Sequence, residues 1–236
     1  MTLTDATVTV VLLPGLDGSG ELMQTFADRA PTGLRAQVVS YPPDVVQDYD
    51  ELVRVVRAQL PEAPHILVGE SYSGPLAVML ATQGGPNLRG VVLAASFVTP
   101  PAWSGWRFLP WRTAFRFPAP AMLVRRLMAP RSPVQAALMR EAILRVGHRV
   151  LAARVRQTLR VDVRRELAML RCPLLYIEAL RDQVVAKRCL RQIREVCPAV
   201  AVAEIDVAHP VLKLAPDEAW VAIENFVSST AATPPR

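Results

Sequence analysis

The chain has 236 residues, of which 51% are hydrophobic and 20% charged, enough to bury the core of one sizeable globular domain. No apolar run reaches the length of a membrane-spanning helix, and no basic region precedes the first apolar run, as it would in a signal peptide. We therefore expect a cytoplasmic protein without a transmembrane segment.

The formal net charge of +6 is unevenly distributed. Residues 97–171 contain 15 arginines and three acidic residues, a net charge of +12, so the remainder of the chain carries −6. Such a basic segment is most often a solvated helical face, and the alternative is that it attracts anionic substrates or makes peripheral contact with an acidic surface. Because no nucleic-acid-binding motif accompanies the charge, we expect no nucleic-acid partner.

The first part of the chain alternates predicted strands and helices. The strands are apolar and rich in β-branched residues, and they cover residues 8–13, 37–41, 65–68 and 89–95. The helices between them cover residues 21–29, 49–60 and 72–83. This alternation with short connections predicts an α/β fold, a mostly parallel sheet with helices on both faces.

The alternation stops after residue 98. Residues 99–133 contain seven prolines, and residues 134–170 are arginine-rich and predicted to be helical. The alternation then resumes, with strands at 173–178 and 200–205 and helices at 187–196 and 217–228. We therefore predict a core of residues 1–98 and 172–236, interrupted by a helical cap insertion at 99–171.

The stretch Gly69-Glu70-Ser71-Tyr72-Ser73-Gly74 joins a predicted strand to a predicted helix. A serine between small residues at a sharp strand-to-helix turn is typical of a nucleophile elbow. The alternative is that Ser71 simply caps the helix, a common role for serine. The strand–turn–helix context favours the nucleophile.

Ser71, Asp182 and His209 each follow the carboxyl end of a predicted strand, where ligands bind in parallel sheets. A serine hydroxyl becomes a good nucleophile when an imidazole accepts its proton, and that imidazole needs a carboxylate on its other nitrogen. These three residue types, in this chain order, therefore predict a serine-based acyl-transfer site.

Other residues compete for two of these roles. His65 lies at the start of a strand, away from the carboxyl edge, and His148 lies among the arginines of the cap, so His209 is the preferred base. Asp206 is only three residues from His209, too close along the chain for the usual acid, so Asp182 is preferred.

A tetrahedral oxyanion also needs fixed hydrogen-bond donors. The backbone N–H of Tyr72, directly after the nucleophile, is one candidate, and the N–H of Leu16 in the loop after the first strand is the other. Asp17 in that loop is expected to organise its own glycine turn. Glu70 is expected to pack beneath the elbow without a catalytic role.

On these motifs the chain resembles the α/β-hydrolase fold serine hydrolases, from the first strand to the last helix, with the insertion where that family carries its cap. Its G-x-S-x-G elbow corresponds to residues 69–73, with Ser73 in place of the last glycine. Residues 14–18 resemble the P-G-x-D-G form of the oxyanion loop, and residues 182–185 fit the acid loop loosely. The resemblance implies that Ser71, Asp182 and His209 form a Ser-His-Asp triad.

The predicted function is hydrolysis of carboxylic esters or thioesters of small to medium acyl size, through an acyl-enzyme on Ser71. The expected partner is a small-molecule ester or thioester, with no cofactor and no metal, because the Cys and His residues lack ligand spacing. Trp103, Trp106 and Trp111 either line an acyl pocket or attach the cap to the core. The alternative functions are an acyltransferase with the same triad and a non-catalytic binding module on the same fold.

Overall fold

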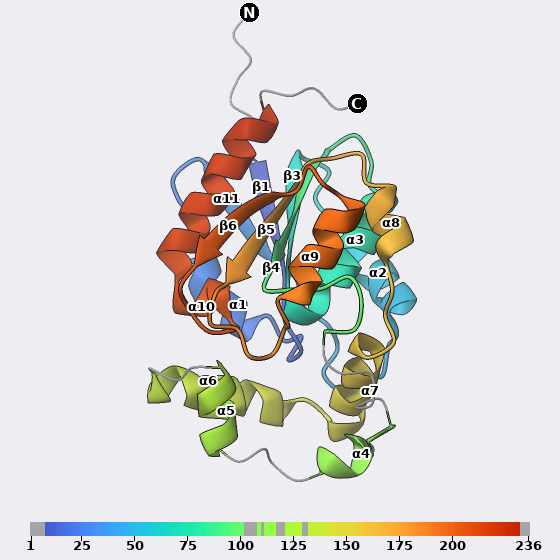
Figure 1. The fold of residues 1–236 in the computed structure, drawn as a ribbon, viewed down its shortest axis with the longest axis vertical. Coiled ribbons are helices and arrows are strands. Elements are labelled where there is room, and N and C mark those ends of the chain that lie inside the picture. Colours follow the sequence, from blue (N-terminus) through green and yellow to red (C-terminus); the bar gives the residue numbers. More distant parts are fainter. Residues whose placement is uncertain (1–7, 102–107, 110, 117–120, 129–131, 232–236) are drawn as a thin grey trace, which may run out of the picture.

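A six-stranded sheet forms the centre of the computed structural model, which describes residues 8–101, 108–109, 111–116, 121–128 and 132–231 (Figure 1). The strand order is β2-β1-β3-β4-β5-β6, and every strand pair is parallel. The predicted α/β fold class is therefore confirmed. The strands are β1 (Val8–Leu13), β2 (Leu34–Val38), β3 (His65–Glu70), β4 (Leu88–Ala94), β5 (Leu174–Ala179) and β6 (Ala201–Ile205).

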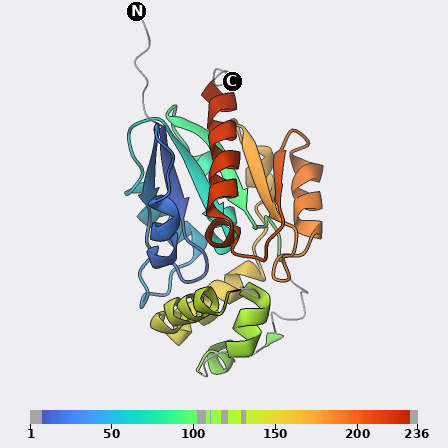
Figure 2. The same cartoon turned by 90° about the vertical axis from the view of Figure 1, so that its left-hand side faces the viewer.

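Helices cover both faces of this sheet (Figures 1 and 2). Val11 and Leu13 of β1 point to one face and Val10 and Leu12 to the other, because successive side chains of a strand alternate. No described helix combines the length and hydropathy needed to cross a membrane. The first face is covered by α2 (Tyr49–Arg57), α3 (Gly74–Thr82), α8 (Arg164–Ala168) and α9 (Arg188–Val196), and the second by α1 (Glu21–Ala27), α10 (Val211–Leu214) and α11 (Pro216–Ala231).

The strand order reverses between β1 and β3. From β1 the chain moves outward to β2, then returns to the other side of β1 to form β3. Loops that leave the carboxyl ends of two strands at such a switch point diverge and leave a crevice between them. The loop at residues 14–20 and the elbow at Ser71 are therefore neighbours at this crevice.

The segment between β4 and β5 forms helices beyond the carboxyl ends of the strands (Figure 1). These are α4 (Trp111–Ala114), α5 (Ala121–Met128), α6 (Pro133–Arg145) and α7 (His148–Thr158). The following helix, α8, contacts α3 and α9, and its Leu167 belongs to the core of the sheet. The division into a core and a cap at 99–171 stays a prediction, and the last part of that segment packs with the core.

The second strand lies earlier than predicted. The apolar run predicted a strand at 37–41, whereas β2 spans Leu34–Val38. Val39 and Tyr41 are buried all the same, at 0% and 2% exposure. The Val39 N–H donates to the Leu12 carbonyl at 3.0 Å and the Tyr41 N–H to the Gly18 carbonyl at 2.7 Å. The apolar run therefore marks where the chain enters the core after the strand has ended.

The elbow brings β3, the first turn of α3 and the end of β4 very close together. A Cβ atom at Gly69 would lie 2.5 Å from the Ser73 carbonyl oxygen, and one at Gly74 would lie 1.8 Å from Ser96 Oγ. Neither position has room for a side chain, which is why small residues are required there.

We predict that Gly74→Ala destabilises the protein by about 1–3 kcal/mol, since the methyl group must displace Ser96 and the elbow with it. Urea denaturation measures the loss. Gly85→Ala is the matched control, because a Cβ there would meet no atom within 4 Å. Equal unfolding free energies for the two variants would contradict the packing argument.

Candidate active site

Ser71 has a left-handed backbone conformation at the point where β3 ends. Its φ of 51° is uncommon for a residue other than glycine and costs on the order of 1–3 kcal/mol unless the surroundings impose it. The Ser96 hydroxyl donates to the Ser71 carbonyl at 2.6 Å, and the Tyr176 hydroxyl donates to the Ser96 carbonyl at 2.9 Å. The ends of β4 and β5 thus hold the strained turn that presents Ser71 Oγ.

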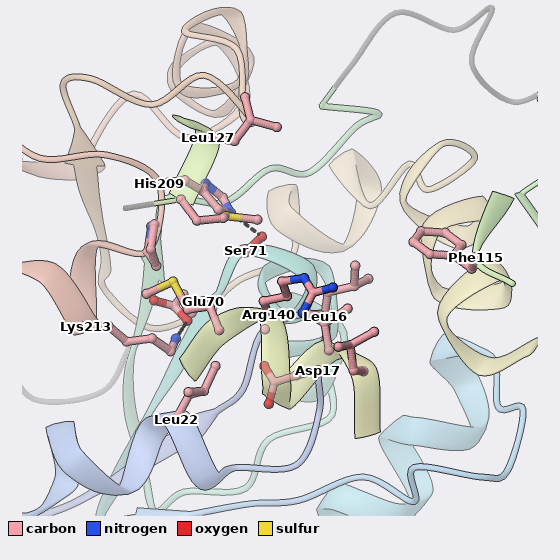
Figure 3. A pocket seen from close by; sticks show the side chains of 16 residues that line it. Leu16, Asp17, Leu22, Glu70, Ser71, Phe115, Leu127, Arg140, His209 and Lys213 are labelled. Carbon is pink, nitrogen blue, oxygen red and sulfur yellow. Dashed lines mark hydrogen bonds and ion pairs between the residues drawn. The ribbon is translucent and has the colours of Figure 1, made fainter. Parts of the chain in front are cut away.

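The structure brings Ser71, Asp182 and His209 together. His209 Nε2 lies 2.8 Å from Ser71 Oγ (Figure 3), and His209 Nδ1 lies 2.7 Å from Asp182 Oδ2. The carboxylate requires the proton on Nδ1, which leaves Nε2 free to accept the proton of Ser71. The imidazole is therefore placed to activate the serine.

Asp182 and His209 are both fixed by the loops that carry them. Asp182 Oδ1 accepts the backbone N–H groups of Val184 at 2.7 Å and Val185 at 2.9 Å, which leaves Oδ2 for the histidine. The His209 carbonyl accepts the Val211 N–H at 2.7 Å, at the start of α10. The side chains of His209 and Asp182 are only 5% and 8% exposed, so water weakens their hydrogen bond little.

The loop after β1 has every carbonyl from Pro14 to Gly18 hydrogen-bonded. The Gly18 N–H donates to the Gly15 carbonyl at 3.1 Å, and the Gly18 carbonyl accepts from Tyr41. The Leu16 N–H, by contrast, donates to no group in the part of the chain that the structure describes. A rigid loop with an N–H that has no acceptor is what an oxyanion donor requires.

Ser73, the departure from the G-x-S-x-G pattern, ties the elbow to this loop. Its side chain is fully buried, and its hydroxyl donates to the Pro14 carbonyl. Because that proton is already used, the Tyr41 hydroxyl is the donor in its 2.7 Å hydrogen bond with Ser73 Oγ. The hydroxyl that replaces the family glycine thus connects the two loops of the site.

Arg154 of α7 is a buried residue of the site that the sequence did not predict. It is 3% exposed, so the expected solvated arginine face is wrong for this residue. Nη1 donates to the carbonyls of Leu16 at 2.9 Å and Asp17 at 2.7 Å, and Nη2 donates to Pro42 at 3.1 Å. Burial lowers the pKa of the guanidinium. Its place on the same helical stripe as Val150 and Leu151 was the available signal.

A cavity of about 310 Å³ opens beside Ser71 and His209 (Figure 3). Most of its wall is apolar, contributed by the loop after β1 and by the helices between β4 and β5. The apolar side chains are Leu16, Leu22, Phe115, Leu127, Met128, Met139, Ile143 and Leu144. Asp17, Glu70, Arg140 and Lys213 add the charged groups. Within the described ranges, no three His, Cys, Asp or Glu side chains gather in a way that could hold a metal ion.

Glu70, next to the nucleophile, forms an ion pair with Lys213 of α10. The two side chains are 3% and 8% exposed, and Glu70 Oε1 has no hydrogen-bond partner among the described residues. A lone buried carboxylate here would repel a developing oxyanion, so its neutralisation by Lys213 favours the chemistry of the site.

Of the three tryptophan residues predicted to line the pocket or attach the cap, Trp111 is the one that the structure describes. Trp103 and Trp106 lie outside the described residues. Trp111 stacks on Phe115 with ring centroids 5.8 Å apart, and Phe115, not Trp111, is among the residues that line the cavity. A pocket role for the tryptophans stays a prediction.

One family model matches most of the chain. The model of the family described as serine aminopeptidase, S33 matches residues 18–206. The matched stretch contains Ser71 and Asp182 and ends three residues before His209. Among curated proteins, no sequence matches the chain.

Solved structures are similar over nearly the whole chain. An esterase from Rhodococcus, RhEst1, has a TM-score of 0.74 at 22% identity, covering 96% of this chain and 92% of its own. A lipase-esterase related protein from Clostridium acetobutylicum has a TM-score of 0.77 at 12% identity, covering 94% and 95%. An enol-lactonase from Burkholderia xenovorans has a TM-score of 0.72 at 16% identity, covering 96% and 92%. At these identities the likeness establishes the shared fold.

We predict that Lys213→Met destabilises the protein by about 3–5 kcal/mol, because it leaves the Glu70 carboxylate buried without a counter-charge. The double variant Glu70→Gln/Lys213→Met removes both charges and is expected to recover most of the loss. Chemical denaturation of the single and double variants checks this. Lys187→Met, at an exposed position, is the control. A double variant as unstable as Lys213→Met would contradict the ion-pair argument.

Proposed function

The chain belongs to the serine aminopeptidase S33 family and has the α/β-hydrolase fold, and on this premise we propose that it cleaves carboxylic ester or thioester bonds through an acyl-enzyme on Ser71. The observation that carries the proposal is the position of the His209 ring between Ser71 Oγ and Asp182 Oδ2, at 2.8 Å and 2.7 Å. This arrangement is suited to moving a proton from a serine to a leaving group.

The proposed reaction begins when His209 Nε2 accepts the Ser71 proton and Oγ attacks the acyl carbon. The resulting oxyanion accepts hydrogen bonds from the N–H groups of Leu16 and Tyr72, while Asp182 stabilises the imidazolium. His209 then gives its proton to the leaving alcohol or thiol. Water, activated by the same imidazole, attacks the acyl-enzyme, and the carboxylic acid leaves with Ser71 restored.

The cavity supports an apolar acyl group of modest size. Its volume of about 310 Å³ lies at the lower end of the range for small-molecule pockets, and its wall is mainly aliphatic. Burial of each methylene there contributes about 0.8 kcal/mol. The acyl chain would lie against Met139 and Ile143, with the carbonyl carbon at Ser71.

The charges that line the cavity favour an ester of an apolar acid over a substrate with a free α-ammonium group. A substrate with a free α-ammonium group needs an uncompensated carboxylate near the reacting carbon. Of the two carboxylates that line the cavity, Glu70 is neutralised by Lys213, and Asp17 uses its Oδ2 to accept the backbone N–H and hydroxyl of Ser19 at 3.1 and 2.8 Å. We therefore expect p-nitrophenyl butyrate to be a better substrate than a p-nitrophenyl ester of an amino acid with a free α-amino group.

Ser71→Ala is expected to reduce p-nitrophenyl ester hydrolysis at least ~10³-fold, because the covalent step is lost. The wild type is expected to form one covalent adduct with a fluorophosphonate probe, which mass spectrometry locates at Ser71. Ser228→Ala, on the exposed part of α11, is the control. Equal activity in Ser71→Ala and wild type would exclude the proposed nucleophile.

The same experiments separate the alternative functions. A non-catalytic binding module would leave Ser71 unlabelled by the probe. An acyltransferase would give more transfer product than acid when an alcohol or amine is added, because the acceptor then competes with water for the acyl-enzyme. Hydrolysis that is unaffected by added acceptors supports the hydrolase.

We predict that Ile143→Trp shifts the preferred p-nitrophenyl ester toward shorter acyl chains, because the indole fills part of the cavity. The ratio of kcat/KM for octanoate to that for butyrate is expected to fall at least ~10-fold. Leu138→Trp is the control on the same helix, since Leu138 is 53% exposed and does not line this cavity. An unchanged ratio in Ile143→Trp would show that the acyl chain binds elsewhere.

A further inference from the structure

Helix α7 contacts both residues that carry the expected oxyanion donors. Arg154 donates to the Leu16 carbonyl at 2.9 Å, and its guanidinium carbon lies 6.0 Å from the centroid of the Tyr72 ring. Gln157 Oε1 accepts the Tyr72 hydroxyl at 2.8 Å. Residues three apart share a face of a helix, so one face of α7 reaches Leu16 and Tyr72 together.

The Arg154 contacts fix the direction of the Leu16 N–H. This N–H belongs to the peptide unit between Gly15 and Leu16, whose carbonyl is held by the Gly18 N–H. The carbonyls of the next two peptide units, Leu16 and Asp17, are both held by Arg154 Nη1. Because peptide units are planar, the Asp17 carbonyl that Arg154 holds orients the Gly18 N–H of the same unit, and the Gly15 carbonyl that this N–H holds orients the Leu16 N–H.

The loop after β1 has a space that the Arg154 guanidinium fills. Gly18 has a φ of 68°, and a Cβ atom there would lie 2.5 Å from Arg154 Nη1, so the glycine leaves the space that the arginine fills. Arg154 forms no ion pair with an acid in the described part of the chain, and its charge is solvated by three carbonyl groups and the faces of Tyr41 and Tyr72. The contacts are thus directional hydrogen bonds from a buried cation.

Packing of the Leu16 side chain reinforces the arrangement. Leu16 lies against a small apolar cluster formed by Val146, Val150 and Leu151 at the start of α7. The loop is therefore held on its backbone by Arg154, on its side chain by this cluster, and on its Pro14 carbonyl by Ser73 of the elbow. Only the last of these contacts comes from the elbow itself.

We propose that Arg154 is a positioning residue of the oxyanion hole, which keeps the Leu16 N–H aimed at the oxyanion while Gln157 holds Tyr72. The proposal rests on the proposed function, since it concerns the same reaction. Donors that are already oriented stabilise the developing charge without reorganisation, and loss of one such donor costs about 10²–10³ in kcat. The segment between β4 and β5 then contributes to the rate of the reaction as well as to the shape of the acyl pocket.

The test compares Arg154→Met with Arg149→Met, an exposed arginine of the same helix. Arg154→Met is expected to lower kcat for p-nitrophenyl butyrate by ~10²-fold with KM changed by less than ~3-fold, because the donor acts on the transition state. Arg154→Lys is expected to be intermediate, since an ammonium group can reach a carbonyl but lacks the guanidinium fork. Arg149→Met is expected to match the wild type.

Two further measurements separate positioning from general stabilisation. The rate of Ser71 phosphonylation by the fluorophosphonate is expected to fall together with kcat, because the phosphoryl oxygen uses the same donors. Hydrogen exchange followed by mass spectrometry is expected to speed up at residues 14–18 in Arg154→Met while the strands β3 and β4 keep their protection. A merely structural arginine would lower the thermal midpoint and leave kcat per folded molecule unchanged.

A folded Arg154→Met protein with wild-type kcat, phosphonylation rate and exchange at residues 14–18 overturns the proposal. If Arg154→Met does not fold, the proposal is tested with Arg154→Lys and Gln157→Leu. A wild-type kcat in both of these variants overturns the proposal. A wild-type protein that neither hydrolyses esters nor reacts with the probe would instead overturn the proposed function. Faster exchange at residues 14–18 in Arg154→Lys would then still establish the effect of Arg154 on the loop.

Discussion

The close approach of β3, α3 and the end of β4 at Ser71 is the constraint on which the site depends. The φ of 51° at Ser71 turns the chain sharply enough to present Oγ above the sheet. It is kept there by the Ser96 hydroxyl on the Ser71 carbonyl and by Gly74, which leaves room for Ser96. Strain of this kind persists only where the surroundings impose it, so the core of the sheet supports the reactive geometry directly.

Hydrogen bonds and an ion pair between buried polar groups connect the elbow to the loop after β1, to α7 and to α10. Ser73 connects the elbow to the Pro14 carbonyl, Arg154 connects α7 to the next carbonyls of that loop, and Lys213 neutralises Glu70. Each contact removes a cost that an unpaired buried group would otherwise impose. As a result, the Glu70 carboxylate is neutralised by Lys213, and the Leu16 N–H keeps no acceptor among the described residues.

Local patterns predicted the elements that depend on local physics, and the exceptions have physical causes. The six strands and the turn at Ser71 follow from apolar runs, β-branched residues and glycines, although the second strand lies earlier than its apolar run. That run continues to Tyr41 because the side chains of Val39 and Tyr41 are buried in the core, although the strand ends at Val38. Residue type was also misleading at Arg154. Its charge suggested a solvated face, although its neighbours on the same side of the helix are buried.

The sequence by itself determined the α/β fold and the position of Ser71, Asp182 and His209 just after the carboxyl ends of strands, because the alternation of strands, helices and loops follows from periodicity and turn chemistry. It could not determine which side chains fill the space above them. That depends on how α5, α6 and α7 lie over the strand ends, and their placement is set by contacts between residues more than a hundred positions apart, such as Arg154 with Leu16. Only the tertiary structure therefore decided that Arg154 of α7 holds the loop after β1 and that Phe115 lines the cavity.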